Sequence, residues 1–338
     1  MKYAVLGKTG FEASVISFGG IPIQRKDIDN TKAVVDILEA AGVNYIDTAK
    51  AYSVSEAYLG NALKGRRDKF FLASKSMSRD YDGMKKDVLD SLAKLGTDYI
   101  DLYQCHNVPV KDFEKIFSEN GAYKALTELK EAGKILHIGF TCHHVEDMQC
   151  VIDNYADKFE TVMFPFNIVE DQGTEQLTKL KELGYGTIAM KPFAGGNLDD
   201  PDLALRYIIE SGVIDIALAG MADPKEAQQD VDVANNLVPL SEEEKAKCDA
   251  IRKELGTQFC RRCGYCMPCT MDIIIPNAFL YRNYVLRYNM YDWAAQRYKD
   301  TMAVTASACV ECGVCETRCP YHLPIREMMK DTARIFGF

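Results

Sequence analysis

Strand-like and helical segments alternate eight times up to about residue 240 of the 338-residue chain. The strand-like runs are short and apolar, and they occupy residues 14–20, 44–49, 70–75, 99–106, 135–141, 161–167, 186–193 and 214–220. The segments between them have helical spacing, as in 83–96, where Met84, Val88, Leu92 and Leu95 recur among lysines and aspartates. Eight strands that are each followed by a helix predict a (β/α)8 barrel of the α/β class.

The main alternative fold for this alternation is an open, doubly wound sheet. Such a sheet predicts a G-x-G-x-x-G phosphate loop after an early strand, and "SFGGIPIQRKD" lacks that spacing. The opening "KYAVLGKTGFEASVIS" places glycines between two short apolar segments, which predicts a β-hairpin ahead of the barrel that covers its closed end.

Charge and composition narrow the functional classes. A net charge of −9 argues against nucleic acid as the main partner, because phosphate-binding surfaces need basic residues in excess. No run approaches the roughly 20 apolar residues of a membrane helix, and "MKYAVLGKTG" lacks the features of a signal peptide. We therefore expect a cytoplasmic protein without a membrane partner. In that reducing compartment, clustered cysteines among the 12 of the chain indicate metal binding or catalysis and not disulfides.

The pattern changes after the eighth helix. Ser241 and Glu244 form a capping-box sequence that opens one last helix, and Gly256 is placed to end it. A cysteine-rich segment follows. We expect two domains, the barrel over residues 1–255 and a small, mainly helical one over residues 256–338.

Polar side chains stand where three successive strand-like runs end. They are Asp47, Lys75 and His106, and Tyr52 lies just beyond the first of them. Each residue alone could serve as a cap, a surface residue or a core histidine. Function in such barrels sits at the carboxyl ends of the strands, so four complementary groups there predict an active site.

The segments that contain these residues, "IDTAKAY", "FFLASK" and "DYIDLYQCH", resemble those of the aldo/keto reductase family. The resemblance continues through "KLGTDYIDLY", "GKILHIGF" and "MKPFAGG". It implies that Asp47, Tyr52, Lys75 and His106 are the family's catalytic tetrad, which interconverts a small carbonyl substrate and its alcohol by hydride transfer. A nearby ammonium lowers the pKa of a phenol, which suits Tyr52 as proton donor. Asp47 would keep the lysine charged, and His106 would orient the carbonyl.

The same resemblance implies a nicotinamide cofactor, NAD(P)H, but the chain departs from the family at its contacts. The Ser-Asn pair after the fifth strand and the glutamine on the sixth are replaced, and "AGMADPKEAQQD" contains no arginine for a 2′-phosphate. The choice between NAD and NADP therefore stays open, and flavin mononucleotide (FMN) is an alternative. The candidate contacts are Thr141, His143, Asn167, Lys191, Gly195, Gly196, Gly220, Met221 and Lys225.

Eight cysteines form two groups near the end of the chain. The first group is Cys260, Cys263, Cys266 and Cys269, and the second is Cys309, Cys312, Cys315 and Cys319, with Pro320 after it. The second group has the C-x2-C-x2-C-x3-C-P spacing of bacterial ferredoxins, in which the fourth cysteine binds the other cluster. We therefore expect two [4Fe–4S] clusters with crossed fourth ligands, Cys319 completing the first and Cys269 the second. Zinc is the alternative, but three successive cysteines at this spacing exceed a two-cysteine zinc knuckle.

Barrels with such a tail form a subgroup of the aldo/keto reductases, from which this chain differs by Thr270 in place of a proline. The leading hypothesis is an oxidoreductase whose clusters transfer electrons. Since nicotinamide moves a hydride and a cluster one electron, coupling them requires a flavin or a redox partner protein. Two alternatives remain: a carbonyl reductase with structural or redox-sensing clusters, and an electron-transfer protein on an inactive barrel.

Overall fold

Eight parallel strands close into a barrel in the computed structural model, which describes residues 1–255, 260–262, 264–319 and 321–337. The strands follow one another around the barrel in chain order, with β10 beside β3. They are β3 (Ile16–Gly19), β4 (Tyr45–Asp47), β5 (Phe71–Ser76), β6 (Ile100–Cys105), β7 (Ile135–Thr141), β8 (Thr161–Pro165), β9 (Gly186–Met190) and β10 (Ile216–Gly220). Seven of them lie within a predicted run, and β5 extends one residue beyond its run. The closure of the barrel excludes the open doubly wound sheet.

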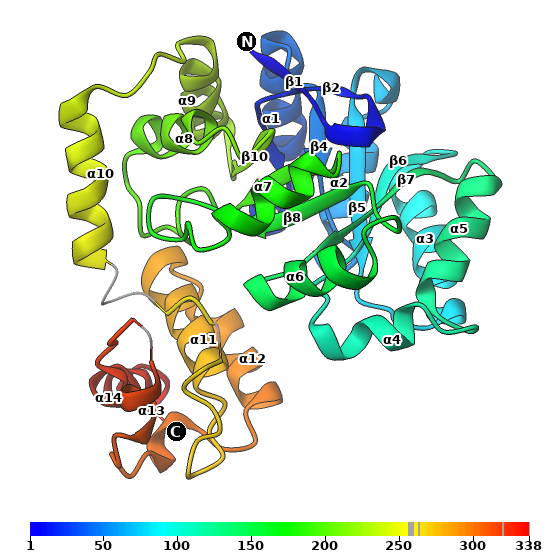
Figure 1. Ribbon diagram of the computed structural model, residues 1–338. Helices are drawn as coiled ribbons and strands as arrows, with labels where there is room; N and C mark the ends of the chain where they lie inside the picture. The colour runs from blue at the N-terminus through cyan, green and yellow to red at the C-terminus, as the bar shows by residue number, and fades with distance from the viewer. Residues whose placement is uncertain (256–259, 263, 320, 338) are drawn as a thin grey trace. The chain divides into compact units, whose positions relative to one another are not determined.

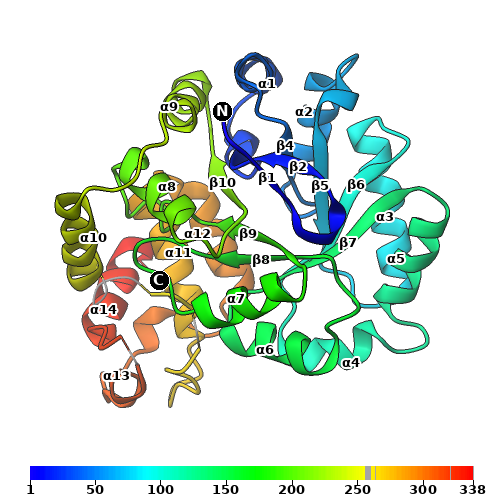
Figure 2. The ribbon, with the colours of Figure 1, turned by 45° about the horizontal axis from the view of Figure 1, so that its top comes forward.

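Helices surround the barrel (Figures 1 and 2). They are α1 (Ile28–Ala41), α2 (Ser55–Ala62), α3 (Tyr81–Leu95), α4 (Phe113–Ile116), α5 (Ala122–Glu131), α6 (Val145–Asn154), α7 (Thr174–Glu182), α8 (Pro201–Glu210) and α9 (Pro224–Asn235). In α3 the predicted apolar stripe is the buried face, and an αL glycine, Gly96, ends the helix. The alternation along the chain therefore predicted this part of the fold correctly.

A hairpin of β1 (Tyr3–Val5) and β2 (Glu12–Ser14) closes the amino ends of the strands, as the sequence predicted. Its turn lies against the start of β9, where the backbone N–H of Lys8 donates to Gly184 O over 2.8 Å. A β-carbon on Gly7, whose φ is +48°, would lie 2.1 Å from Gly186 N. The turn therefore requires glycine both for its backbone conformation and for its close approach.

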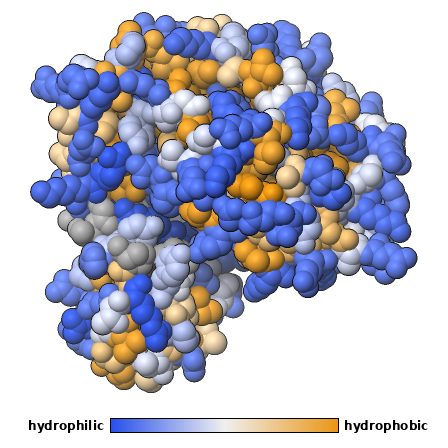
Figure 3. All heavy atoms as spheres, in the orientation of Figure 1, coloured by the Kyte–Doolittle hydropathy of each residue, from blue (hydrophilic) through white to orange (hydrophobic). Residues whose placement is uncertain are grey.

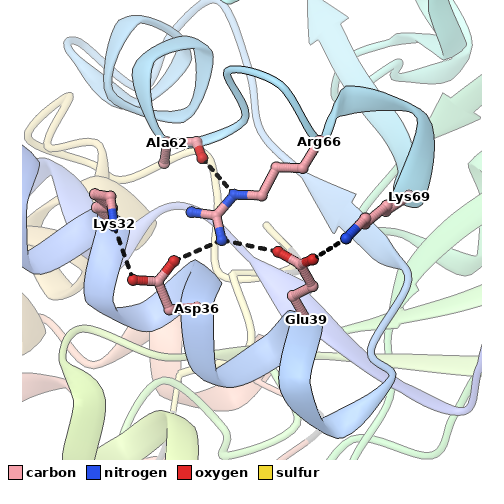
Figure 4. Close-up of polar contacts among 6 residues, drawn as sticks. All are labelled: Lys32, Asp36, Glu39, Ala62, Arg66 and Lys69. Carbon is pink, nitrogen blue, oxygen red and sulfur yellow. Dashed lines mark hydrogen bonds and ion pairs between the residues drawn. The ribbon is translucent and has the colours of Figure 1, made fainter.

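An ion-pair network joins α1 to the segment after α2 on the outside of the barrel (Figure 4). Arg66 donates to Asp36 and Glu39 of α1 and to the carbonyl oxygen of Ala62. Elsewhere on the face that Figure 3 shows, hydrophilic side chains cover much of the outer helices, with apolar ones between them.

The second compact unit consists of Ile168–Glu170, Phe193–Asp199 and Ser241–Phe338. Its helices are α10 (Glu242–Leu255), α11 (Ile275–Tyr288), α12 (Tyr291–Thr301), α13 (Val314–Arg318) and α14 (Ile325–Phe336). The predicted capping box is present, since Ser241 N donates to the Glu244 carboxylate and Glu244 N to the Ser241 hydroxyl. Gly256, the predicted end of that helix, lies outside the described residues, as do Cys263 and Pro320.

The last four helices share an apolar core. Helix α11 packs against α12 and α14, and Phe279, Tyr298 and Phe336 are buried among them. Two of the predicted cluster ligands, Cys266 and Cys319, belong to this core. Within the described part of the chain, no helix is long and apolar enough to span a membrane.

Candidate active site and metal centre

The four predicted tetrad residues lie at or just beyond the carboxyl ends of three adjacent barrel strands. Asp47 is the last residue of β4, Lys75 the fifth of the six residues of β5, and His106 follows β6 directly. Tyr52 lies in the turn between β4 and α2. Because these strands are parallel neighbours, their ends meet on one face of the barrel.

Lys75 lies at the centre of the group. Its Nζ donates to Asp47 Oδ1 over 2.5 Å and to the carbonyl oxygen of Thr48 over 2.8 Å. The same nitrogen lies 4.9 Å from the centroid of the Tyr52 ring. The Tyr52 and His106 rings meet edge to face, with centroids 6.0 Å apart. The structure therefore brings all four side chains together.

The surroundings of Lys75 keep it charged. Burial lowers the pKa of its ammonium, but the charge of Asp47, an interaction with Tyr52 and the hydrogen bond to Asp47 outweigh burial and hold the pKa above its ordinary value. With Lys75 1% and Asp47 3% exposed, water screens this pair little.

His106 has the opposite tendency. Burial, followed by the charges of Lys75 and Arg79, lowers its pKa to about 3, so the imidazole is neutral at physiological pH. Its Nδ1 is buried and has no hydrogen-bond partner in the part of the chain that the structure describes. A neutral imidazole beside a tyrosine is better suited to donate a hydrogen bond to the substrate than to supply a proton.

Two residues that we did not predict support the tetrad. Gln104 Nε2 lies 3.3 Å from Asp47 Oδ2, to which it donates, and Gln104 pairs with Lys75 in the β5–β6 register. Arg79, in the loop after β5, donates to the backbone carbonyl of His106. Gln104 could have been found from strand alternation, since it lies two residues before His106 and on the same side of the strand. The sequence holds no comparable signal for Arg79.

The predicted cofactor contacts in the barrel lie near the ends of four other strands. Thr141 ends β7, and its Oγ1 accepts the backbone N–H of Asn107 over 2.8 Å. Asn167 is buried and donates to the carbonyl oxygen of Lys191. The remaining contacts of this kind are His143, two residues after β7, Gly220 and Met221 at the end of β10, and Lys225 in the first turn of α9. Gly195 and Gly196 have positive φ and belong to the second compact unit.

Four cysteines line one pocket in the second unit. They are Cys269 from the first group and Cys309, Cys312 and Cys315 from the second. Thr270 Oγ1 lies 3.2 Å from Cys312 Sγ, and the N–H of Met271 donates to Cys269 Sγ over 3.4 Å. The Thr270 hydroxyl and the backbone N–H of Val314 hold the pKa of the Cys312 thiol below its ordinary value. The threonine that departs from the subgroup thus lies beside a predicted ligand, and the thiol set fits a [4Fe–4S] cluster.

Two of the other predicted ligands, Cys260 and Cys319, lie near Arg261. Arg261 is 6% exposed, and its guanidinium lies 3.9 Å from the centroid of the Tyr321 ring and interacts electrostatically with Cys260 and Cys319. Cys260 of the first group and Cys319, the last cysteine of the second, thus lie near the same arginine. Cys266 is buried with Cys319 in the apolar core of this unit. Cys263, the remaining predicted ligand, is outside the described residues. Among those that the structure describes, no three Cys, His, Asp or Glu side chains are arranged to hold a single metal ion.

Models of two known protein families match the barrel and the cysteine-rich segment. The model of the aldo/keto reductase family matches residues 15–203, more than half of the chain. The chain belongs to the aldo/keto reductase family. A second model, the 4Fe-4S dicluster domain, matches residues 259–324. The chain is therefore an oxidoreductase of this family with a C-terminal iron–sulfur domain.

Relatives of this aldo/keto reductase include the uncharacterized oxidoreductase YqkF of Bacillus subtilis, 26% identical over 68% of this chain and 78% of the relative. L-Galactose dehydrogenase of Arabidopsis thaliana is 25% identical over 70% of this chain and 88% of that protein. Among solved structures, an aldo-keto reductase from Bacillus halodurans in its holo form matches with a TM-score of 0.65 and 26% identity. That match covers 74% of this chain and 96% of the other, so it concerns the barrel.

Proposed function

We propose that this protein reduces a small carbonyl compound, or oxidises the corresponding alcohol, at the barrel and exchanges single electrons through its C-terminal clusters. The observation that carries the first half is the position of Lys75, bonded to Asp47 and beside the Tyr52 ring. An ammonium at that place favours the phenolate, so Tyr52 gives up its proton more readily than an isolated phenol. In the reverse direction, Tyr52 takes the proton from the alcohol.

The other groups have separate roles in this proposal. Asp47 holds Lys75 in its charged form, and Gln104 holds Asp47. Neutral His106 donates a hydrogen bond to the carbonyl oxygen and so orients the substrate. NAD(P)H, when bound, supplies the hydride; Thr141, His143, Asn167, Lys191, Gly195, Gly196, Gly220, Met221 and Lys225 are proposed to hold it. FMN remains the alternative at this position.

The pocket lined by Cys269, Cys309, Cys312 and Cys315 carries the second half of the proposal. These residues would hold one [4Fe–4S] cluster, and Cys260, Cys263, Cys266 and Cys319 would hold another. Bound clusters supply one-electron transfer, so a flavin or a redox partner protein has to link them to hydride chemistry. We assign residues 1–255 to the reductase function and 256–338 to the clusters, in a protein that we expect in the cytoplasm.

A Tyr52→Phe substitution tests the barrel chemistry. Loss of the phenolic proton should lower kcat/KM for a panel of aldehydes and ketones by about 10²- to 10⁴-fold. Iron content should not change, because Tyr52 is not among the predicted ligands. Tyr58→Phe is the matched control, since it removes a hydroxyl from α2 outside the tetrad. Retained activity in Tyr52→Phe would refute the assignment.

A second experiment separates electron transfer from a structural role of the clusters. The protein is purified without oxygen, NADH or NADPH is added, and cluster absorbance is followed together with any bound flavin. Bleaching of the cluster absorbance supports coupling to the barrel. Carbonyl turnover without bleaching would instead favour structural or redox-sensing clusters.

A further inference from the structure

One arginine binds the loop that carries His106 at both of its ends. Arg79 Nη2 donates to the carbonyl oxygens of His106 and Asn107, over 2.9 and 2.7 Å. Its Nε donates to Asp112 Oδ2 over 2.8 Å. The planar fork of a guanidinium can make these contacts together, whereas an ammonium would hold fewer of them in fixed directions.

Further hydrogen bonds hold the backbone of this loop. Asn107 has a φ of +51°, in the left-handed region that asparagine adopts more readily than most other non-glycine residues. Its N–H donates to Thr141 Oγ1 over 2.8 Å, and the N–H of His106 donates to Ser76 O over 2.9 Å. Both peptide N–H groups and both carbonyl groups of His106 and Asn107 are therefore fixed, which leaves the imidazole little freedom to change its direction.

Arg79 also brings charge. Its side chain is 11% exposed, and its Nη1 is buried without an acceptor among the residues that the structure describes. Among the described residues, Lys75 and Arg79 are the charged groups that lower the pKa of His106, and the Tyr52 ring lies at the edge of its imidazole. Each cation has its own carboxylate, Asp47 for Lys75 and Asp112 for Arg79. Both cations disfavour the positive charge that the imidazole would acquire on protonation.

We propose that Arg79 is a positioning residue of the active site, which aims the His106 imidazole at the substrate carbonyl. His106 then acts as a hydrogen-bond donor and leaves proton transfer to Tyr52. This inference rests on the proposed function, because it assumes that the carbonyl binds beside His106.

Two substitutions separate the charge of Arg79 from its geometry. Arg79→Gln removes the charge and keeps an amide that can donate to one carbonyl. Arg79→Lys keeps the charge and loses the fork. The His106 imidazole pKa is measured by NMR on the full-length holoprotein with labelled histidine, and the His106 signal is assigned with a His106→Gln variant.

In Arg79→Gln we expect the His106 pKa to rise from its low value, although burial and Lys75 keep it below that of a free histidine. The acid limb of the pH profile of kcat/KM should move to higher pH with it. In Arg79→Lys the pKa should stay low while kcat/KM falls about 10- to 100-fold, as expected for a misdirected group.

Arg67→Met is the matched control. The guanidinium of Arg67 also donates to two carbonyl oxygens, of Phe70 and Tyr99, and to the Asp101 carboxylate. Arg67 precedes β5 and is not part of the tetrad. The Arg67→Met substitution should lower the melting temperature and leave the His106 pKa unchanged. If Arg79→Gln and Arg79→Lys likewise change only the melting temperature, Arg79 is structural and the inference is wrong. The NMR measurement needs no turnover, so this result is distinct from failure of the Tyr52 assignment.

Discussion

The two candidate sites of this chain are built in different ways. In the barrel, Lys75 donates to Asp47 and to the Thr48 carbonyl, and the ends of neighbouring strands bring these groups together. In the second unit, four cysteines line a pocket, and the described residues among 260–262 and 264–269 belong to no helix or strand. The difference predicts that the barrel site is preorganised by the fold, whereas the cysteine site would gain stability from a bound cluster.

The ligand arrangement gives the largest predicted effect. Cys269→Ser should abolish one cluster, because a [4Fe–4S] cluster needs its four thiolates, and iron content should fall by about half. The lost EPR signal should be the one that Cys312→Ser removes, since both residues line the same pocket. Cys319→Ser should remove the other signal. Thermal unfolding of the barrel, followed by circular dichroism, should be unaffected.

Cys150→Ser is the control for this experiment, because Cys150 is a half-buried residue of α6 in the barrel. The iron content of the Cys150→Ser variant should equal that of the unmodified protein. If Cys269→Ser removed the same signal as Cys266→Ser, each group would bind its own cluster and the crossed arrangement would be wrong.

The buried ion pair gives the second prediction. Asp47→Asn leaves the Lys75 ammonium 1% exposed without its carboxylate, a change that costs about 3–5 kcal/mol of the free energy of unfolding. Asp47 raises the pKa of Lys75 in the native protein, so in the variant burial lowers that pKa. As the pH rises, the variant therefore loses the charge of Lys75, and the activity that depends on it, at a lower pH than the unmodified protein does. The measurement is the alkaline limb of the kcat/KM profile, which should move to lower pH.

Asp36→Asn is the matched control for Asp47→Asn, since it removes a carboxylate that is half exposed on α1. It should leave the pH profile of activity unchanged. An unmoved alkaline limb in Asp47→Asn would show that the charge of Lys75 does not depend on Asp47.

The barrel could be predicted because its strands are short, apolar and regularly spaced. The positions of Asp47, Lys75 and His106 follow from that pattern, since each stands where a strand ends. Strand alternation would also have placed Gln104 on the side of His106, but a glutamine within an apolar run resembles core filling. The contacts of Arg79 could not be predicted, because its partners are backbone carbonyls, which leave no mark in the sequence.

The second unit was predictable in a different sense. Cysteine spacing indicated the chemistry, and the 4Fe-4S dicluster domain confirms it at the level of the family. The spacing could not show that Thr270 lies beside Cys312, nor that Arg261 stacks on Tyr321 near Cys260. Those contacts depend on how the two cysteine segments fold around one core. The crossed ligation remains a prediction.

The smallest predicted effect tests whether the barrel site is independent of its surface. Arg66 joins α1 to the segment after α2 by bonds to Asp36, Glu39 and Ala62 O (Figure 4). Arg66→Ala should lower the free energy of unfolding by about 1 kcal/mol, because several bonds are lost but the carboxylates are half or a quarter exposed. Urea unfolding should show a smaller loss at high salt, where such pairs are screened. Lys32→Ala, which removes only the exposed pair with Asp36, should have no measurable effect. Since neither substitution touches the strand ends, kcat/KM should stay constant in both. A fall in kcat/KM with Arg66→Ala would mean that the helices outside the barrel help to hold the tetrad, and that this site is less self-contained than its internal bonds indicate.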